Sequence, residues 1–183
     1  MRGVHVVITG GPGSGKTTLV EELGARGYAT VPEAAIQVIA RLNEEMGVEA
    51  QQRFRRSDSA GFQELVLELQ LELEKEFEER EGVVFLDRGR LDGLAYLRHF
   101  EEAPSVGQLE LLTARTYDRV FLLETLSVFE DRSDSGRMSK RADSLAIART
   151  IDQVYREYGH EPIAVPECSV DDRVALVLEH LDP

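Results

Sequence analysis

The sequence predicts an α/β fold in which helices cover both faces of a parallel sheet. Five short apolar segments, most of them rich in β-branched residues, recur along the chain and are separated by stretches long enough for helices. The expected strands are Val4–Ile8, Ala29–Val31, Val83–Leu86, Val120–Leu123 and Ile163–Val165. Short runs that are apolar throughout are typical of strands buried on both faces, and their alternation with helices indicates a doubly wound arrangement.

Composition limits the classes of protein to consider. The length of 183 residues suits one domain, and no repeat, low-complexity tract or linker divides the chain, so we expect a single domain over residues 1–183. The one cysteine, Cys168, has no internal disulfide partner, which favours a reducing, cytoplasmic compartment. No apolar run approaches the ~20 residues of a membrane span. The formal net charge of −13 argues against broad binding to nucleic acid or an anionic membrane, so any phosphate site must be local.

The segment from Leu65 to Leu73 is compatible with two periods. Its leucines alternate as in a strand, but a second set of apolar residues has helical spacing. That set is Phe62, Leu65, Val66, Leu69, Leu73 and Phe77. Because Leu, Glu and Gln dominate and no breaker falls between Gly61 and Gly82, we predict a helix. Leu67 and Leu71 lie off this stripe, so the helix has a broad core face, packs on two sides or contributes a dimer contact.

The strongest functional signal follows the first expected strand. The motif G-x-x-x-x-G-K-[ST] is formed by Gly10, Gly11, Pro12, Gly13, Ser14, Gly15, Lys16 and Thr17. It lies between an apolar strand and an apolar-periodic helix, which is the context of a phosphate-binding loop (P-loop). Glycines let successive N–H groups face an anion, and the helix N-terminus adds a partial positive charge. We expect Lys16 to reach the β- and γ-phosphates of a nucleotide, Thr17 to ligate Mg²⁺ and Thr18 to lie near the α-phosphate.

A second candidate site follows the expected strand Val83–Leu86. Asp87 comes at its carboxyl end, where ligands of open α/β sheets bind, so we expect it to help hold Mg²⁺ directly or through water. The planar guanidinium of Arg88 suits the acceptor or the transferring phosphoryl group. The alternative is a surface Asp-Arg pair in a turn. Asp92 is either a cap of the next helix or a substrate contact.

Together these motifs resemble the P-loop nucleoside and nucleotide kinases. The residues that carry the resemblance are the P-loop, Pro32-Glu33-Ala34-Ala35, Asp87-Arg88-Gly89 with Asp92, and Ala95-Tyr96. From Val4 to Leu181 the chain is similar to small ATPase/kinase-like domains, including the nicotinamide riboside kinase part of a bacterial NAD-biosynthesis regulator. The resemblance implies a three-layer α/β/α P-loop NTPase fold, a five-stranded parallel sheet ordered 2-3-1-4-5 and an arginine-bearing lid over the phosphates.

Two further segments are interpreted through this resemblance. Glu33 resembles the glutamate that deoxynucleoside kinases place after their second strand to meet the acceptor hydroxyl, which implies a general base. The alternative is a first-turn glutamate that complements a helix dipole. Near the C-terminus, Val165-Pro166 and Asp171–Val174 resemble the segment that lies against the nucleotide base, and the alternative there is an ordinary strand-to-helix turn.

The chain departs from the better-known relatives at Gly89. Thymidylate kinases usually have a tyrosine or another larger residue after Asp-Arg, and deoxynucleoside kinases usually carry Glu-Arg-Ser. The difference argues against a thymidine-type acceptor.

A first basic cluster precedes the long predicted helix. Arg53, Arg55 and Arg56 come directly before Ser57-Asp58-Ser59, a sequence that can cap this helix. The arginines are either a solvated approach to the helix or contacts for the acceptor.

A second basic cluster predicts a mobile lid over about residues 130–141. Between Arg132 and Arg141, four basic residues are accompanied by one acid and by serines and a glycine. Long polar loops inside compact domains are usually functional or disordered. We expect Arg132 and Arg137 to bring a guanidinium to the γ-phosphate when the lid closes.

Two classes of function remain. The first is an ATP- and Mg²⁺-dependent kinase for a small-molecule hydroxyl or phosphate acceptor, with nucleosides, nucleotides and nicotinamide riboside all open. The second is a nucleotide-binding regulatory ATPase or GTPase-like module that signals to a protein partner. The sequence has no Asn-Lys-x-Asp element to read guanine, and Arg88 stands where a motor-type ATPase usually has glutamate. The four histidines have no zinc-ligand spacing. The protein is expected to be a monomer or homodimer.

Overall fold

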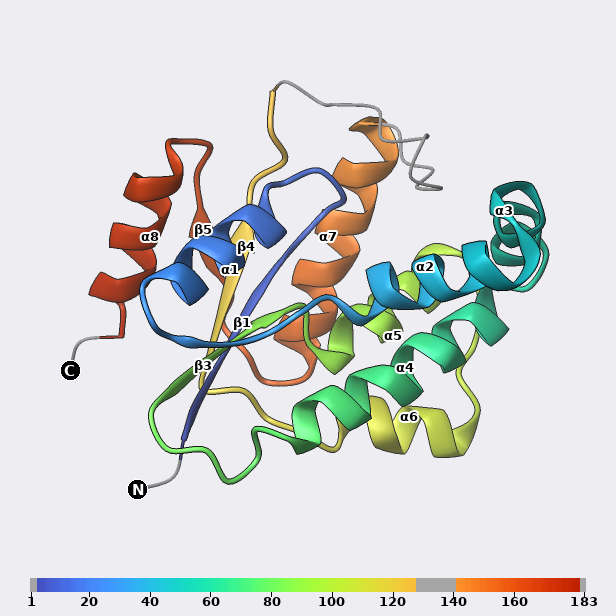
Figure 1. Cartoon of the computed structure of the whole chain (residues 1–183), viewed down its shortest axis with the longest axis horizontal. Coiled ribbons are helices and arrows are strands. Elements are labelled where there is room, and N and C mark those ends of the chain that lie inside the picture. Colours follow the sequence, from blue (N-terminus) through green and yellow to red (C-terminus); the bar gives the residue numbers. More distant parts are fainter. Residues whose placement is uncertain (1–2, 128–140, 182–183) are drawn as a thin grey trace.

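A five-stranded parallel sheet forms the centre of the structure (Figure 1). The computed structural model describes residues 3–127 and 141–181. The strands are β1 (Val4–Gly10), β2 (Ala29–Val31), β3 (Val83–Asp87), β4 (Arg119–Leu123) and β5 (Ile163–Val165). Their order is β2-β3-β1-β4-β5, and every neighbouring pair is parallel. The positions of the strands confirm the prediction from the sequence pattern, and their order confirms what the resemblance to P-loop kinases implies.

Helices pack on both faces of the sheet and complete the three layers (Figure 1). The helices are α1 (Lys16–Ala25), α2 (Ala34–Met46), α3 (Val48–Ser57), α4 (Ser59–Lys75), α5 (Arg90–His99), α6 (Val106–Thr113), α7 (Arg141–Glu157) and α8 (Val170–Glu179). Helices α1 and α8 share one apolar cluster with the sheet, and α5 and α7 share another on the opposite face. The fold is the α/β/α sandwich of P-loop proteins.

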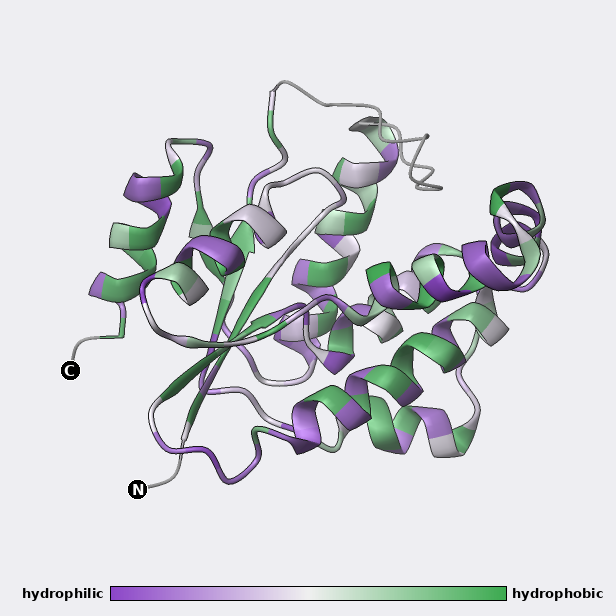
Figure 2. Ribbon diagram, viewed as in Figure 1, coloured by the Kyte–Doolittle hydropathy of each residue, from purple (hydrophilic) through white to green (hydrophobic). Residues whose placement is uncertain are grey.

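The central strand β1 shows why the strands lack an alternating polar pattern. Val6 and Ile8 belong to the cluster formed with α1 and α8, whereas Val7 belongs to the cluster formed with α5 and α7. All three side chains are fully buried. Because both faces of a doubly covered sheet are dry, its strands are nearly continuous apolar runs. The strands are accordingly mostly hydrophobic, while hydrophobic and hydrophilic residues are mixed along the helices (Figure 2).

Helix α4 packs on two sides, one of the arrangements that its leucine pattern predicts. Leu67 lies in the core cluster on the α5 and α7 side of the sheet, and Leu71 packs against that cluster. Phe62 lies instead in a smaller cluster with residues of α2. The helix begins as predicted, because the side chain of Asp58 accepts a hydrogen bond of 2.8 Å from the N–H of Gly61.

The register of the strands brings three loops to one edge of the sheet. Ile8 of β1 pairs with Asp87 of β3, and Val31 of β2 pairs with Leu86, one residue earlier. The chain segments that follow these strands therefore emerge side by side, and they include the P-loop and Glu33. Among the described residues, no helix is both long enough and apolar enough to span a bilayer.

Candidate functional site

The loop Gly10–Thr17 joins β1 to α1 in a conformation that requires glycine at three positions. Gly10, Gly13 and Gly15 have φ angles of 142°, 73° and 86°, which side chains disfavour. Gly15 is also the N-cap of α1, so the N–H groups of the first helical turn meet the loop. The loop therefore has the backbone form of an anion-binding nest at a helix N-terminus.

Lys16 is folded back onto its own loop. Its side chain is buried, and Nζ donates to the carbonyl of Gly11 at 2.9 Å and to Oγ of Ser14 at 3.4 Å. Burial, and next the positive charge of Arg88, lower the pKa of Lys16 to about 8. Phosphate oxygens in the loop would offer this ammonium charged partners in place of neutral ones, which favours its protonated form.

Asp87 ends β3 beside the first turn of α1. Oγ1 of Thr17 donates to Oδ2 of Asp87 at 2.7 Å, and Oδ1 of Asp87 is buried with no hydrogen-bond partner among the described residues. Burial, and next the carboxylate of Glu33, raise the pKa of Asp87 to about 6. The oxygen of a hydroxyl and an unpartnered carboxylate oxygen are ligands that suit Mg²⁺.

The number of protein ligands also fits Mg²⁺. Within residues 3–127 and 141–181, no group of three or more His, Cys, Asp and Glu side chains could hold a metal ion. Mg²⁺ is usually held by one or two protein oxygens, because it keeps several waters and takes further ligands from substrate phosphates. Thr17 and Asp87 are therefore sufficient for a nucleotide-bound Mg²⁺ and are too few for a metal site made by the protein alone.

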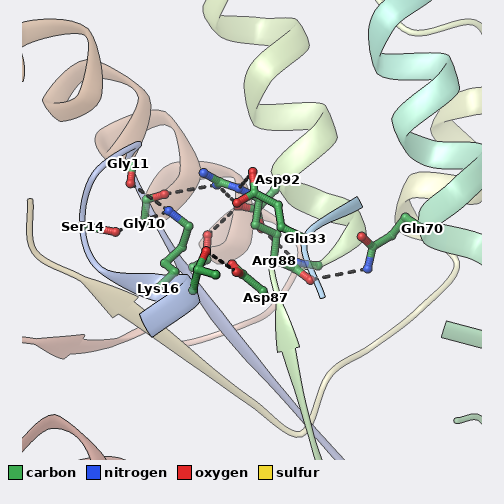
Figure 3. Close-up of polar contacts among 12 residues, drawn as sticks. Gly10, Gly11, Ser14, Lys16, Glu33, Gln70, Asp87, Arg88 and Asp92 are labelled. Carbon is green, nitrogen blue, oxygen red and sulfur yellow. Dashed lines mark hydrogen bonds and ion pairs between the residues drawn. The ribbon is translucent and has the colours of Figure 1, made fainter. Parts of the chain in front are cut away.

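Arg88 connects the P-loop to the opposite wall of the site (Figure 3). Nη1 donates to the carbonyl of Gly10 at 3.1 Å and to Oδ1 of Asp92 at 2.8 Å. Nε lies 3.2 Å from Oε1 of Glu33, at an angle outside the hydrogen-bond range, so this contact is an ion pair. The guanidinium carbon is 5.3 Å from the ring centre of Tyr96, within cation–π range. The backbone of Arg88 has a φ of 77°, an uncommon conformation that these contacts hold in place.

Asp92 is saturated by donors from the protein. Oδ1 accepts from Oγ1 of Thr9 at 2.6 Å and from Nη1 of Arg88, and Oδ2 accepts from the N–H of Gly89 at 3.1 Å and from Oη of Tyr155 at 2.8 Å. Burial, and next the charge of Asp92, raise the pKa of Tyr155 well above its ordinary value, so the phenol stays protonated and donates. Of the two predicted roles, the geometry matches the cap of α5, because Asp92 occupies its N3 position.

Glu33 forms an ion pair with Arg88, a contact that the sequence does not predict. It is the N-cap residue of α2, but its side chain makes no capping hydrogen bond. The carboxylate is instead buried beside Nε of Arg88 and lines the same cavity as Lys16. A glutamate that served only the helix dipole would remain in solvent near the first N–H groups of α2.

A cavity of about 910 Å³ opens from the P-loop. It extends from the loop between α2, α4 and α5, and Thr18, Glu33 and Arg88 line it together with Lys16 and Thr17. Its apolar wall is made by Ile39, Phe62, Val66, Leu67, Tyr96, Phe100 and Leu112. The cavity joins a phosphate site to a space that suits a compact organic molecule.

Two arginines of the first basic cluster reach this cavity. Arg55 and Arg56 lie in α3 and line the cavity, and the guanidinium of Arg55 is 4.8 Å from the ring centre of Phe62. Arg53 is not among the lining residues, and its exposed side chain makes a long contact of 3.9 Å with Glu49. Contact of Arg55 and Arg56 with an acceptor stays a prediction.

The predicted lid falls largely outside the described residues. Arg132 and Arg137 lie in residues 128–140, for which the structure gives no description. Their contact with the γ-phosphate and the closure of residues 130–141 stay predictions. The described chain resumes at α7, and Asp143 in the first turn of α7 lines the cavity.

Sequence reasoning missed the group of residues that supports the start of α5. Glu74 is fully buried and accepts from Nε of Arg90 at 2.9 Å, Nη1 of Arg115 at 3.1 Å and Oη of Tyr117 at 3.0 Å. Gln70, one turn earlier, donates to Glu74 at 2.8 Å. No local signal identifies these residues, because a glutamate among many on a charged helix is normally solvated.

The same surroundings account for Gly89, where the chain departs from the better-known kinases. A Cβ atom at this position would lie 2.6 Å from Oη of Tyr155 and 2.8 Å from Cε2 of Tyr117. Both rings are buried and hydrogen-bonded, so neither moves freely. The larger residue of the relatives is therefore excluded here by the packing of two tyrosines.

The fold and the loop define a P-loop nucleotide-binding protein. A family described as an AAA domain matches residues 5–173, a range that contains the P-loop, Glu33, Asp87 and Arg88. The chain belongs to this AAA-domain family. A search of curated proteins finds no match to the sequence.

Solved kinase structures share the fold over almost the whole chain. A deoxyadenosine kinase from M. mycoides with bound dATP has a TM-score of 0.68 and 15% identity, covering 98% of this chain and 100% of the kinase. A thymidylate kinase from Ehrlichia chaffeensis has a TM-score of 0.60 and 14% identity, covering 98% and 99%. A thymidylate kinase from Candida albicans has a TM-score of 0.56 and 14% identity, covering 98% and 91%. At these identities the likeness establishes the fold alone.

The packing at Gly89 predicts the effect of a single methyl group. Gly89→Ala should lower the free energy of unfolding by about 1–3 kcal/mol, because the new Cβ overlaps two fixed rings. Gly107→Ala in α6 is the matched control, since a Cβ there meets nothing within 4 Å. The free energy of unfolding of this control variant should equal that of the wild type or exceed it by up to about 1 kcal/mol. Urea unfolding measures both, and equal midpoints for the Gly89 variant and the wild type would contradict the packing argument.

The buried cluster around Asp92 predicts a large cost for removing one charge. Asp92→Asn should lower the free energy of unfolding by about 3–5 kcal/mol, because Arg88 loses a buried partner and an amide N–H₂ faces other donors. The control is Asp152→Asn, at a surface pair of 3.0 Å with Arg156, with an expected cost below about 1 kcal/mol. A cost at Asp92 no greater than that of the control would show that the cluster contributes little to stability.

Proposed function

We propose that the protein is an ATP- and Mg²⁺-dependent phosphotransferase that acts on a hydroxyl or phosphate group of a small molecule. The observation that carries the proposal is the cavity of about 910 Å³ that continues from Lys16 and Thr17 to an apolar wall. Pockets of roughly 300–1,000 Å³ are typical of small-molecule sites. A module that only bound nucleotide and signalled to a partner would need no such space beyond the phosphates.

The side chains at the phosphate end support transfer of the γ-phosphoryl group. Phosphoryl transfer depends on positioning and on neutralising charge, for which Lys16 and Arg88 supply two buried cations. Thr17 and Asp87 would hold Mg²⁺, which when bound neutralises phosphate charge. Arg88 is fixed by the Gly10 carbonyl and by Asp92, so its position is set before substrates arrive.

Glu33 is the proposed general base for a hydroxyl acceptor. The acceptor oxygen forms a bond to the γ-phosphorus, the bond from that phosphorus to the β–γ bridging oxygen breaks, and ADP leaves. The hydroxyl proton passes to the carboxylate of Glu33, which lines the cavity. The ion pair with Arg88, in which Nε lies 3.2 Å from Oε1 of Glu33, holds the orientation of this carboxylate.

The acceptor is proposed to come from the nucleosides, nucleotides and related ribosides. The structural neighbours include a deoxyadenosine kinase with bound dATP and thymidylate kinases, and the sequence resembles nicotinamide riboside kinase domains. The apolar and aromatic wall suits a flat ring, and Arg55 and Arg56 suit an anionic acceptor.

A screen of acceptors tests the proposal. ATP consumption with Mg²⁺ is measured against nucleosides, nucleoside monophosphates and vitamin-derived ribosides, and each rate is compared with the rate without acceptor. Stimulation of about tenfold or more by one compound supports a kinase. Acceptor-independent hydrolysis that responds to none of them would favour the regulatory module.

Glu33→Gln separates a base from a structural side chain. As a base, Glu33 should contribute about 10²-fold or more to kcat, while ATP affinity changes little, because glutamine keeps the shape but takes no proton. The matched control is Glu45→Gln at the exposed end of α2, near Arg41 at 3.7 Å, which should keep its turnover. Near-normal kcat in Glu33→Gln would remove Glu33 from the chemistry.

The raised pKa of Asp87 predicts how the need for Mg²⁺ depends on pH. Protons compete with the metal for this carboxylate, so the half-saturating Mg²⁺ concentration should rise as the pH falls through about 6. Because the triphosphate titrates in the same range, Asp87→Asn supplies the baseline. The variant should need more Mg²⁺ at neutral pH and should show a weaker pH dependence than the wild type. Identical magnesium curves at every pH would exclude Asp87 as a metal ligand.

A further inference from the structure

Side chains of two helices that are distant in sequence donate hydrogen bonds to backbone carbonyls of the P-loop. Oγ of Ser144, in the first turn of α7, donates to the carbonyl of Pro12 at 2.6 Å. Nη1 of Arg173, in the first turn of α8, donates to the carbonyl of Ser14 at 2.6 Å. Ser144 is fully buried and Arg173 is 3% exposed, so neither contact is a chance surface encounter.

The planarity of the peptide bond makes these contacts relevant to anion binding. In a trans peptide the C=O of one residue and the N–H of the next point in opposite directions. A carbonyl of Pro12 that is fixed on the outside of the loop therefore turns the N–H of Gly13 inward. In the same way, a fixed carbonyl of Ser14 turns the N–H of Gly15 inward. Inward N–H groups are the donors that a phosphate requires in such a nest.

The peptide after Gly11 fits the same scheme. Its carbonyl accepts from Lys16, and no side chain of α7 or α8 in the described part of the chain donates to it. The next residue is Pro12, which has no N–H, so this peptide can turn its oxygen toward the site without loss of a donor. The peptides that do carry inward donors at Gly13 and Gly15 are the ones that Ser144 and Arg173 hold.

We propose that Ser144 and Arg173 are positioning residues of the phosphate loop, which hold the Pro12 and Ser14 carbonyls outward so that the N–H groups of Gly13 and Gly15 face the bound phosphates. The proposal needs only that the loop binds a nucleotide, and it goes beyond the proposed transfer reaction. It gives α7 and α8 a direct role in the affinity of the site.

The hydroxyl chain at Ser144 has a fixed direction. Oγ of Ser144 lies 3.2 Å from Oγ1 of Thr125, just after β4. A serine hydroxyl has one hydrogen, and Ser144 gives it to Pro12. Thr125 must therefore donate to Ser144, which orients the serine toward the loop. Thr125 thus acts on the loop through Ser144.

Close contact at two glycines shows how tightly the loop is held. A Cβ on Gly11 would overlap the carbonyl oxygen and Oγ of Ser144, and a Cβ on Gly15 would lie 3.1 Å from Nη1 of Arg173. Glycine at these positions allows the backbone conformation of the loop, and it also lets α7 and α8 pack closely against the loop.

Arg173 is poorly explained as a residue kept for stability. Its two hydrogen bonds go to neutral carbonyls, of Ser14 and of Pro166, and Nη2 is buried without a hydrogen-bond partner among the described residues. Burial of this charge has a desolvation cost that two neutral carbonyls offset less well than a carboxylate would. A positive charge directly behind the loop, in contrast, favours anion binding whenever phosphate is present.

Binding of inorganic tripolyphosphate and of ATP to the full chain tests the proposal by calorimetry. Ser144→Ala and Arg173→Met should each weaken both ligands by about tenfold or more, while unfolding midpoints stay close to the wild type. Thr125→Val should act in the same direction, and Arg173→Lys should lie between the methionine variant and the wild type. Because binding is measured without transfer, these outcomes do not depend on whether the protein is a kinase.

Two matched controls remove similar contacts without touching the loop. Thr150→Ala removes a hydroxyl that donates within α7 at 3.2 Å, and Arg26→Met removes an arginine that joins α1 to Asp171 of α8. Both should bind tripolyphosphate within about threefold of the wild type. In amide NMR spectra, tripolyphosphate should shift Gly13 and Gly15 strongly in the wild type and weakly in Ser144→Ala and Arg173→Met.

Two results would overturn the proposal. The first is wild-type affinity within about threefold in folded Ser144→Ala and Arg173→Met, with unchanged shifts at Gly13 and Gly15. The second is an equal loss of affinity in the two controls, which would make the effect one of general stability. If a variant at Ser144 or Arg173 fails to fold, Thr125→Val and Arg173→Lys decide by the same criteria.

Discussion

The buried contact between Arg88 and Asp92 is the interaction on which the arrangement of the site depends. It joins the end of β3 to α5, and through the Gly10 carbonyl it reaches the P-loop. Tyr155 ties the same carboxylate to α7. Because Arg88 has an uncommon backbone conformation, the surrounding contacts must outweigh its strain. One buried cluster thus joins the P-loop, the end of β3 that carries the proposed metal ligand Asp87, and helices α5 and α7.

The charges of this cluster indicate the kind of ligand that it is built for. The carboxylates of Glu33, Asp87 and Asp92 are buried with the cations Lys16 and Arg88, and Asp92 is already saturated by donors. Asp87 has an unpartnered oxygen and a raised pKa, and Lys16 has a lowered pKa and neutral acceptors. A nucleoside triphosphate with a divalent cation would give Lys16 an anionic partner and the free oxygen of Asp87 a cationic one.

Much of the fold, but less of the site, could be predicted from the sequence. Strand positions and the P-loop depend on local composition and spacing, so they were predicted within a few residues. The sheet order came from the resemblance to kinases. The contacts of Tyr155 with Asp92, Ser144 with Pro12 and Arg173 with Ser14 join residues 63, 132 and 159 positions apart. No periodicity reports such pairs, because they form only when helices pack at the sheet edge.

Labelled ATP tests most directly whether the protein transfers a phosphoryl group to a small molecule. The acceptor need not be known beforehand. ATP labelled at the γ-phosphate is incubated with the protein, Mg²⁺ and a protein-free extract of small metabolites, with the Lys16→Ala variant as control. We expect the wild type to transfer label to an organic product at a rate at least about tenfold higher than that of the Lys16→Ala variant. Label that appears only as inorganic phosphate, at a rate the extract does not change, would contradict it.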